Sequence, residues 1–204
     1  MKVLPRSFYE RDTALVAKDL LGKMLIRKFG RKKLSGIIVE TEAYYGKEDP
    51  ASRAYSGRPK YCAKLLYDLP GKALVYNVHN NWLFNVIAHE KGKVGAVLIR
   101  AVEPLNGIEE MKKYRRKENV YELTNGPGKL SKALRITKEL NGIFVTDKRS
   151  EVVIVDNKIN FILGNSKRIG VTKDLPVELR FFVKDNPFVS KFFVIRVTRI
   201  EKVM

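Results

Sequence analysis

The sequence feature that most constrains the fold is a succession of short apolar stretches separated by turn residues along almost the whole chain. Basic residues, glycine and proline break the apolar pattern between these stretches. Strands following one another in this way, with few helices between them, predict an antiparallel α+β fold. The predicted strands span residues 24–29, 34–44, 73–78, 82–87, 96–102, 152–155, 159–163, 168–171, 179–183 and 192–200.

Three helical segments are predicted between the strands. Asp12 or Thr13 can cap a helix with an apolar face that ends at Gly22, and two further helices are expected at about 107–117 and 129–135. The length of 204 residues fits one domain, so we expect a single domain over 1–204.

The charge of the chain restricts its partners. Forty Lys and Arg residues against 22 Asp and Glu give a formal net charge of +18, which favours a polyanionic partner. Nucleic acid is favoured over a membrane surface because no strongly amphipathic basic helix is present. No uncharged apolar run approaches the ~18 residues of a membrane span, so we expect no membrane association.

The cysteine and histidine content bears on compartment and metal chemistry. The single cysteine, Cys62, cannot form an internal disulfide, which indicates a reducing compartment. With only two histidines, the chain is also poorly supplied for a Cys/His zinc site. We expect an intracellular protein, in the cytoplasm or nucleoid, or in the nucleus of a eukaryotic cell.

The segment 37–44 carries the most unusual side chains. Alternate residues of a strand share a face, so Glu40, Glu42 and Tyr44 are predicted to point the same way. One chemistry for such a face is a metal-dependent nuclease using Glu40, Glu42 and Asp49. Another is a carboxylate that deprotonates water beside an aromatic ring that holds a planar base. The pair of glutamates alone does not decide between them.

Two further segments have features of nucleic-acid binding. The polar turn His79-Asn80-Asn81 between aromatic strands could insert into a duplex, although its aromatics could equally be core residues. The loop 125–129 lacks the first glycine of a nucleotide-binding phosphate loop, because position 123 is Leu. Backbone N–H groups at Gly126 and Gly128, with Lys129, could still bind a DNA phosphate.

Taken together, these segments resemble the alkyladenine (3-methyladenine) DNA glycosylase family. The resemblance runs from Phe8 to about Ser190 and rests on motifs that occur in the family's order. In sequence letters, the motifs are DLLGK at 19–23, IVETEAY at 38–44, EDPAS at 48–52, PG at 70–71, VY at 75–76, VLIRAVEPL at 97–105, NGPGKL at 125–130, RIG at 168–170, LRFF at 179–182 and NPFVS at 186–190.

The resemblance implies a fold and an activity. The fold would be one compact α+β domain around a curved, mostly antiparallel sheet with flanking helices. The activity would be that of a monofunctional DNA glycosylase, a hydrolase that flips an alkylated or deaminated purine out of duplex DNA and cleaves its N-glycosidic bond. The family needs no metal or redox cofactor. The implied partner is double-stranded DNA with a damaged purine, bound by a monomer.

The resemblance also implies catalytic and pocket roles. Glu42 corresponds to the general base that activates water, Arg100 to an arginine that helps hold that water and the DNA backbone, and the carbonyl of Ile169 to a group that orients it. In the base pocket, Tyr44 and Tyr76 correspond to aromatics that sandwich the flipped purine. Asn85 corresponds to an asparagine at the rim that discriminates among purines.

Two positions depart from the family pattern. Arg53 stands where the family has a histidine that stacks on the base, and a guanidinium suits a neutral purine better than a cationic one. The hairpin tip, His79 and Asn80, replaces an inserted tyrosine and is one residue shorter, which predicts a weaker wedge.

Three alternative functions remain open from the sequence. They are a non-catalytic DNA-binding descendant of a glycosylase, the metal-dependent nuclease described above, and a bifunctional glycosylase/lyase that uses a lysine Schiff base.

Overall fold

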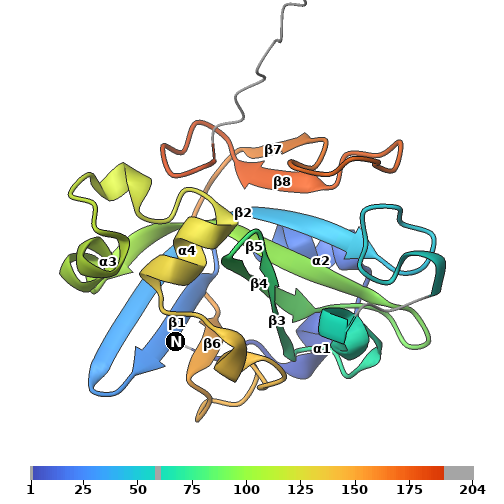
Figure 1. The fold of residues 1–204 in the computed structure, drawn as a ribbon, viewed down its shortest axis with the longest axis horizontal. Coiled ribbons are helices and arrows are strands. Elements are labelled where there is room, and N and C mark those ends of the chain that lie inside the picture. The colour runs from blue at the N-terminus through green and yellow to red at the C-terminus, as the bar shows by residue number, and fades with distance from the viewer. Residues whose placement is uncertain (1, 58–60, 191–204) are drawn as a thin grey trace, which may run out of the picture.

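The computed structural model describes residues 2–57 and 61–190, which build one curled antiparallel sheet with helices packed around it (Figure 1). The strand order is β3-β4-β5-β2-β1-β6, and a hairpin of β7 and β8 joins at β2. The helices are α1 (Arg6–Tyr9), α2 (Thr13–Asp19), α3 (Ile108–Arg115) and α4 (Pro127–Ala133). The strands are β1 (Met24–Phe29), β2 (Lys32–Tyr45), β3 (Ala73–Val78), β4 (Asn81–Ile87), β5 (Gly95–Asn106), β6 (Val152–Val155), β7 (Leu163–Ser166) and β8 (Arg180–Val183).

The long strand β2 organises the sheet. Its first half pairs with β1 on one side, whereas its later residues 40–42 pair with β8 on that side. Along its other side β2 pairs with β5 from Ser35 to Tyr45. Strands pair with both edges of β2, and its residues from Leu34 to Ala43 are all buried. In Figure 1 the β7–β8 hairpin lies along the margin of the sheet next to β2.

The two faces of β2 have different roles. On one face the hydroxyl of Thr41 donates to the carbonyl of Ala17 in α2, at 2.8 Å, and Val39 and Ala43 join the hydrophobic core. Helix α2 begins where predicted, because the Asp12 carboxylate accepts from the backbone N–H groups of Ala14 and Leu15. Glu40 and Glu42 lie on the opposite face of β2.

Most of the predicted architecture is confirmed. The structure is a single α+β domain, and predicted strands 24–29, 73–78 and 152–155 have the observed bounds of β1, β3 and β6. The irregular stretch between β2 and β3 contains the 3₁₀ turns Tyr55–Gly57 and Tyr61–Tyr67. Two more 3₁₀ turns, Val120–Glu122 and Lys138–Leu140, flank α4 in the chain. The predicted strand at 192–200 lies outside the described residues.

Two predicted strands are wrong. Residues 159–162 are not in a strand, and β7 begins only at Leu163. Ile159 and Phe161 instead cover Gly22, where their side-chain carbons leave no room for a Cβ. Residues 168–171 form a loop, because Gly170 has a φ of +74° and the Arg168 side chain is turned into the protein.

The β3–β4 hairpin ends in a tight two-residue turn. His79 and Asn80 have φ of 47° and 61°, as a type I′ turn requires. The hairpin packs against the start of α4, where a Cβ at Gly128 would lie 2.8 Å from side-chain atoms of Asn81. Glycine at position 128 therefore permits a close approach between the hairpin and α4.

In the described part of the chain, none of the helices has the length and apolar character that a bilayer crossing requires.

Candidate functional site

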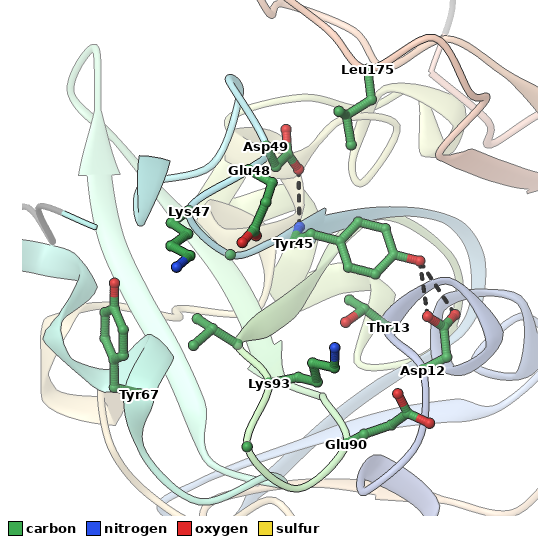
Figure 2. A pocket seen from close by; sticks show the side chains of 13 residues that line it. Asp12, Thr13, Tyr45, Lys47, Glu48, Asp49, Tyr67, Glu90, Lys93 and Leu175 are labelled. Carbon is green, nitrogen blue, oxygen red and sulfur yellow. Dashed lines mark hydrogen bonds between the residues drawn. The ribbon is translucent and has the colours of Figure 1, made fainter. Parts of the chain in front are cut away.

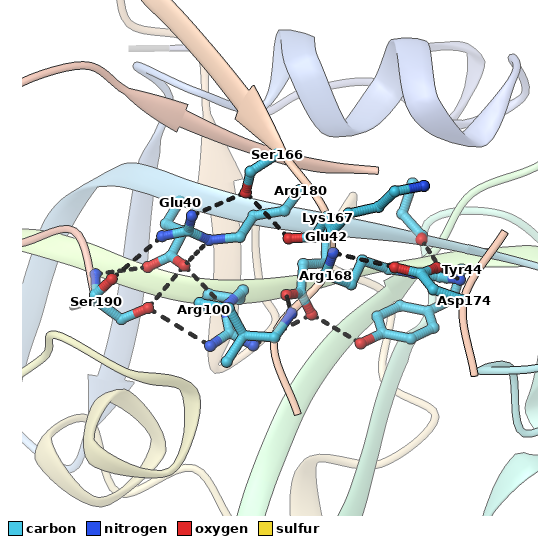
Figure 3. Close-up of polar contacts among 12 residues, drawn as sticks. Glu40, Glu42, Tyr44, Arg100, Ser166, Lys167, Arg168, Asp174, Arg180 and Ser190 are labelled. Carbon is cyan, nitrogen blue, oxygen red and sulfur yellow. Dashed lines mark hydrogen bonds and ion pairs between the residues drawn. The ribbon is translucent and has the colours of Figure 1, made fainter. Parts of the chain in front are cut away.

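Glu40 and Glu42 lie on the face of β2 that points away from α2, as the alternation predicts, and both side chains are fully buried. The guanidinium of Arg100 joins them: its Nε lies 2.8 Å from Glu40 Oε1, and its Nη1 lies 3.1 Å from Glu42 Oε2 (Figure 3). Burial alone would lower the pKa of Arg100, but the charges of Glu42 and Glu40 outweigh burial and raise it. Arg100 therefore remains a cation between two carboxylates.

The position of Arg100 follows from an irregularity in the β2–β5 ladder. Ala101 pairs with Glu40 and Ile99 pairs with Thr41, so Arg100 has no partner of its own on β2. A bulge of this kind re-aims a side chain. The loop that leads into α4 is held beside it, since Asn125 forms a bridge with Ala101.

Four hydrogen bonds surround the Glu40 carboxylate. Oε1 accepts from Arg100, from Arg180 Nε at 2.7 Å and from the Ser190 hydroxyl at 2.7 Å, and Oε2 accepts from the backbone N–H of Ser190 at 2.8 Å. Burial raises the pKa of Glu40, but the charges of Arg100 and Arg180, with hydrogen bonds from Arg180 and Ser190, lower it overall. Four donors, two of them from arginines, therefore hold the Glu40 carboxylate, three at Oε1 and one at Oε2.

The Glu42 carboxylate has fewer partners. Oε2 accepts from the Tyr44 hydroxyl at 2.7 Å and faces Arg100, while Oε1 accepts from the backbone N–H of Ile169 at 2.7 Å. Burial raises the pKa of Tyr44, and the charge of Glu42 raises it further, so the phenol stays protonated and donates. Among the described residues, three contacts leave Glu42 with capacity to accept a fourth hydrogen bond at Oε1.

Arg168 ties together three segments around this pair of glutamates. Its guanidinium donates to both oxygens of Asp49, at 2.6 and 2.7 Å, to Asp174 and to the backbone carbonyl of Ala43. It also lies over the ring of Tyr44, 4.5 Å from the centroid. Burial would lower the pKa of Arg168, but hydrogen bonds and charges from Asp49 and Asp174 raise it strongly. This clamp precedes Ile169 in the chain and so fixes the N–H that binds Glu42.

A cavity of about 840 Å³ opens next to the glutamates and gathers most of the residues predicted for the site. The lining contains Tyr44, residues of the β3–β4 hairpin tip and the loop before α4. It also contains the loop 169–173 that follows Arg168. The predicted site residues in the lining are Tyr44, Arg53, Tyr76, His79, Arg100, Gly126, Gly128, Lys129 and Ile169.

Three predicted site residues are not in the lining. Glu42 is enclosed by lining neighbours: Tyr44 and Arg100 contact it, and Leu98 pairs with it across the sheet. Asn80 lies in the hairpin turn. Asn85 is buried in the β3–β4 hairpin, where its amide nitrogen donates to the carbonyls of Leu74 and Leu83, at 3.1 and 3.4 Å.

A second cavity, of about 500 Å³, contrasts with the first (Figure 2). Its lining includes four acidic residues, Asp12, Glu48, Asp49 and Glu90, with Lys47 and Lys93. Tyr45 crosses it and donates to Asp12, and burial together with the charge of Asp12 raises the pKa of Tyr45 to about 12. None of the residues predicted for the glycosylase site lies in this lining.

The geometry argues against a nuclease metal centre at Glu40, Glu42 and Asp49. Both oxygens of Asp49 are bound by Arg168, and they also accept from the backbone N–H groups of Tyr45 and Ala51. The Glu40 carboxylate is held by the two arginines Arg100 and Arg180 and by Ser190. Within residues 2–57 and 61–190, no group of three or more His, Cys, Asp or Glu side chains is placed to hold a metal ion.

Arg168, Arg180 and Ser190 have contacts that reasoning from the sequence did not assign. The only signal in the sequence is a charged residue inside an apolar stretch, at Arg168 and Arg180, which indicates a buried ion pair when the stretch is buried. For Ser190 the residue type carries no comparable signal.

Comparison with known proteins identifies the family. A family model described as methylpurine-DNA glycosylase matches residues 7–187. A Clostridium perfringens protein assigned by name as a 3-methyladenine DNA glycosylase is 45% identical over 205 residues, covering 92% of this chain and 98% of the relative. A protein of the same assignment from Aeropyrum pernix is 39% identical, covering 93% of this chain and 94% of the relative.

The match spans the glutamates, the cavity and the Arg168 clamp. The chain belongs to the methylpurine-DNA glycosylase family.

Proposed function

We propose that this protein, a DNA glycosylase of the 3-methyladenine type, flips a damaged purine from duplex DNA into the larger cavity and hydrolyses its N-glycosyl bond with water activated by Glu42. In this reaction water attacks C1′ of the nucleotide, and the bond between C1′ and the purine nitrogen breaks. The purine leaves with the electron pair of that bond, and the proton of water passes to Glu42, which then releases it. A cationic alkylpurine leaves as a neutral base, whereas an uncharged purine takes up one proton from solvent as it leaves. The products are a free base and an abasic site.

The observation that carries this proposal is the difference in hydrogen bonding between two adjacent buried carboxylates. Glu42 has fewer donors than Glu40, and its partners Tyr44, Arg100 and Ile169, which hold it in place, all line the cavity. A fixed carboxylate at this position can accept a proton from water and stabilise positive charge that develops on the sugar. In this scheme Arg100 and the backbone of Ile169 position the water.

The cavity has features suited to an extrahelical base. Tyr44 and Tyr76 both line it and present aromatic rings to a planar ligand. The side chains of Lys129 and Lys173 also line the cavity and supply positive charge that would attract the phosphates of DNA. In this proposal the turn at His79 and Asn80 enters the duplex next to the flipped nucleotide.

The backbone at Gly126 and Gly128, with Lys129, is proposed to contact a phosphate, and Asn85 to act indirectly through the β3–β4 hairpin. We further propose that a monomer binds the duplex. The net charge of +18 predicts DNA affinity that falls with salt, with a log–log slope of about −0.9 per neutralised phosphate. Salt-independent binding would contradict this part of the proposal.

The experiment that tests the function is single-turnover base release from duplex oligonucleotides that carry hypoxanthine, ethenoadenine or 7-methylguanine, in EDTA. Wild-type protein should produce an abasic site, and Glu42→Gln protein should produce far less while it still binds the duplex. Borohydride should trap no covalent complex, because the proposed reaction uses water rather than a lysine.

Each other outcome identifies a different function. Strand cleavage that EDTA abolishes would favour a nuclease, and a trapped complex would favour a glycosylase/lyase. Tight DNA binding without base release from any of the three lesions would favour a non-catalytic binding protein.

A further inference from the structure

Each of the two tyrosines in the cavity has a guanidinium on one face of its ring. Arg168 lies over Tyr44 with 4.5 Å between its central carbon and the ring centroid, and Arg53 lies over Tyr76 with 5.0 Å. Both distances fall within the range of a cation–π interaction. The two rings that would hold a base therefore already interact with cations.

The two guanidiniums differ in how their charge is balanced. Arg168 is fully buried and is paired with Asp49 and Asp174, so the protein neutralises it. Arg53 is partly exposed in the cavity, and no carboxylate among the described residues lies within ion-pair distance of it. Its charge therefore acts on whatever occupies the space next to Tyr76.

The rest of the lining does not offset this charge. Among the described residues, the formally charged members of the lining are Arg53, Arg100, Lys129 and Lys173, all cations, with no Asp or Glu. The negative charge of Glu42, which lies behind the lining, is already paired with Arg100. A ligand in the cavity is therefore surrounded by positive charge.

A positive environment separates damaged purines by their own charge. Purines alkylated at a ring nitrogen, such as 7-methylguanine, are cations, whereas deaminated purines such as hypoxanthine are neutral. A cationic base is repelled by Arg53 and competes with it for the electron-rich face of Tyr76. A neutral base avoids both costs, and its carbonyl or ring nitrogen can accept a hydrogen bond from the guanidinium.

We propose that Arg53 determines specificity, and that through it this pocket selects neutral damaged purines over cationic alkylpurines. The inference rests on the proposed function, since it assumes that the damaged base enters this cavity. It assigns to Arg53 a direct contact with the base rather than a role in folding.

The test compares Arg53→Gln with wild type in single-turnover base release from duplexes that carry hypoxanthine or 7-methylguanine. Each variant rate is divided by the wild-type rate for the same lesion, so the different intrinsic stabilities of the two glycosidic bonds cancel. We expect Arg53→Gln to raise the 7-methylguanine rate relative to the hypoxanthine rate by about 2- to 30-fold, the range of one cation–π interaction.

Two control variants isolate the contact. Lys173→Gln removes the same charge from the lining at a residue that lies over no tyrosine ring, and it should change both lesions by a common factor. Arg53→Lys keeps the charge and should keep the preference for hypoxanthine. A relative rate that moves less than about twofold in Arg53→Gln, or an equal shift in Lys173→Gln, would overturn the assignment.

Binding measurements in a Glu42→Gln background separate this inference from the proposed function. The Glu42→Gln protein should bind the hypoxanthine duplex more tightly than the 7-methylguanine duplex, and adding Arg53→Gln should remove that difference. Equal affinity for both duplexes before Arg53 is changed would overturn the inference. Absence of base release from every duplex by wild type would instead overturn the proposed function, while the binding comparison would still decide the role of Arg53.

Discussion

Glu40 and Glu42 lie two residues apart on the same strand and the same face, both fully buried and both in contact with Arg100. Glu40 accepts four hydrogen bonds and has a second arginine, Arg180. Glu42 accepts one hydrogen bond from a phenol and one from a backbone N–H, and it shares a single arginine. The comparison teaches that burial and charge are the same for the two carboxylates, and that the number of donors around each distinguishes the one proposed to activate water.

The largest expected effect is the loss of catalysis in Glu42→Gln. A carboxamide keeps the size of the side chain but cannot take a proton from water, so single-turnover base release should fall by about 10²- to 10⁴-fold. Duplex affinity measured by fluorescence anisotropy should change little, because Glu42 is behind the cavity lining. A rate within a few-fold of wild type would remove the distinction drawn between the two glutamates.

The matched change, Glu40→Gln, should act mainly on stability. It leaves Arg100 and Arg180 without the carboxylate that they share, and breaking a buried ion pair by removing one partner costs about 3–5 kcal/mol. The free energy of unfolding from urea titration should therefore fall much further in Glu40→Gln than in Glu42→Gln. Similar losses in both variants would show that the two carboxylates stabilise the fold equally.

Acid provides a way to discharge Glu40 without mutation. Its pKa is lowered in the folded protein from an ordinary value of 4.5, so its stabilising contribution is complete above that value. The contribution is lost as pH falls below 4.5 toward the folded pKa, by up to about 1.4 kcal/mol per pH unit.

The prediction concerns the difference in unfolding free energy between wild type and Glu40→Gln, which has no titrating group at this position. That difference should stay constant from about pH 7 to pH 5 and shrink in more acidic buffers. A difference that grows on acidification would contradict the lowered pKa. The measurement is a series of denaturant titrations at fixed ionic strength.

The contrast between the glutamates also marks where prediction from the sequence ends. Alternation along β2 predicts that both side chains share a face, because the period of a strand is local. Their partners are not local: Ser190 reaches Glu40 from 150 positions away, and Arg168 reaches Asp49 from 119 positions away. An isolated carboxylate such as Asp49 therefore suggests a metal ligand in the sequence, whereas the structure makes it half of an ion pair.

The same limit applies to the fold. Strands such as 73–78 could be predicted in full, because apolar alternation and flanking turn residues agree there. The stretch 168–171 has an apolar pattern too, but Arg168 bonds to Asp49 and Asp174, and that contact turns the segment into a loop. Tertiary ion pairs overrode local propensity at the residues that border the site.

The smallest expected effects come from removing one hydroxyl donor from each carboxylate. Ser190→Ala removes a donor from Glu40, and Tyr44→Phe removes one from Glu42. Each should lower the free energy of unfolding by about 1 kcal/mol, the net value of one buried hydrogen bond. The backbone N–H of Ser190 remains in place, so Glu40 keeps three of its four hydrogen bonds in Ser190→Ala.

The two hydroxyl variants should differ in catalysis although they match in stability. Tyr44→Phe changes the group that fixes the Glu42 carboxylate, so its single-turnover rate should fall about tenfold, equivalent to about 1.4 kcal/mol. Ser190→Ala changes Glu40, which keeps three other donors, so its single-turnover rate should fall less than that of Tyr44→Phe. Equal rate losses would mean that Glu40, Arg100 and Glu42 act as one network, in which acceptor capacity at Glu42 is not the deciding difference.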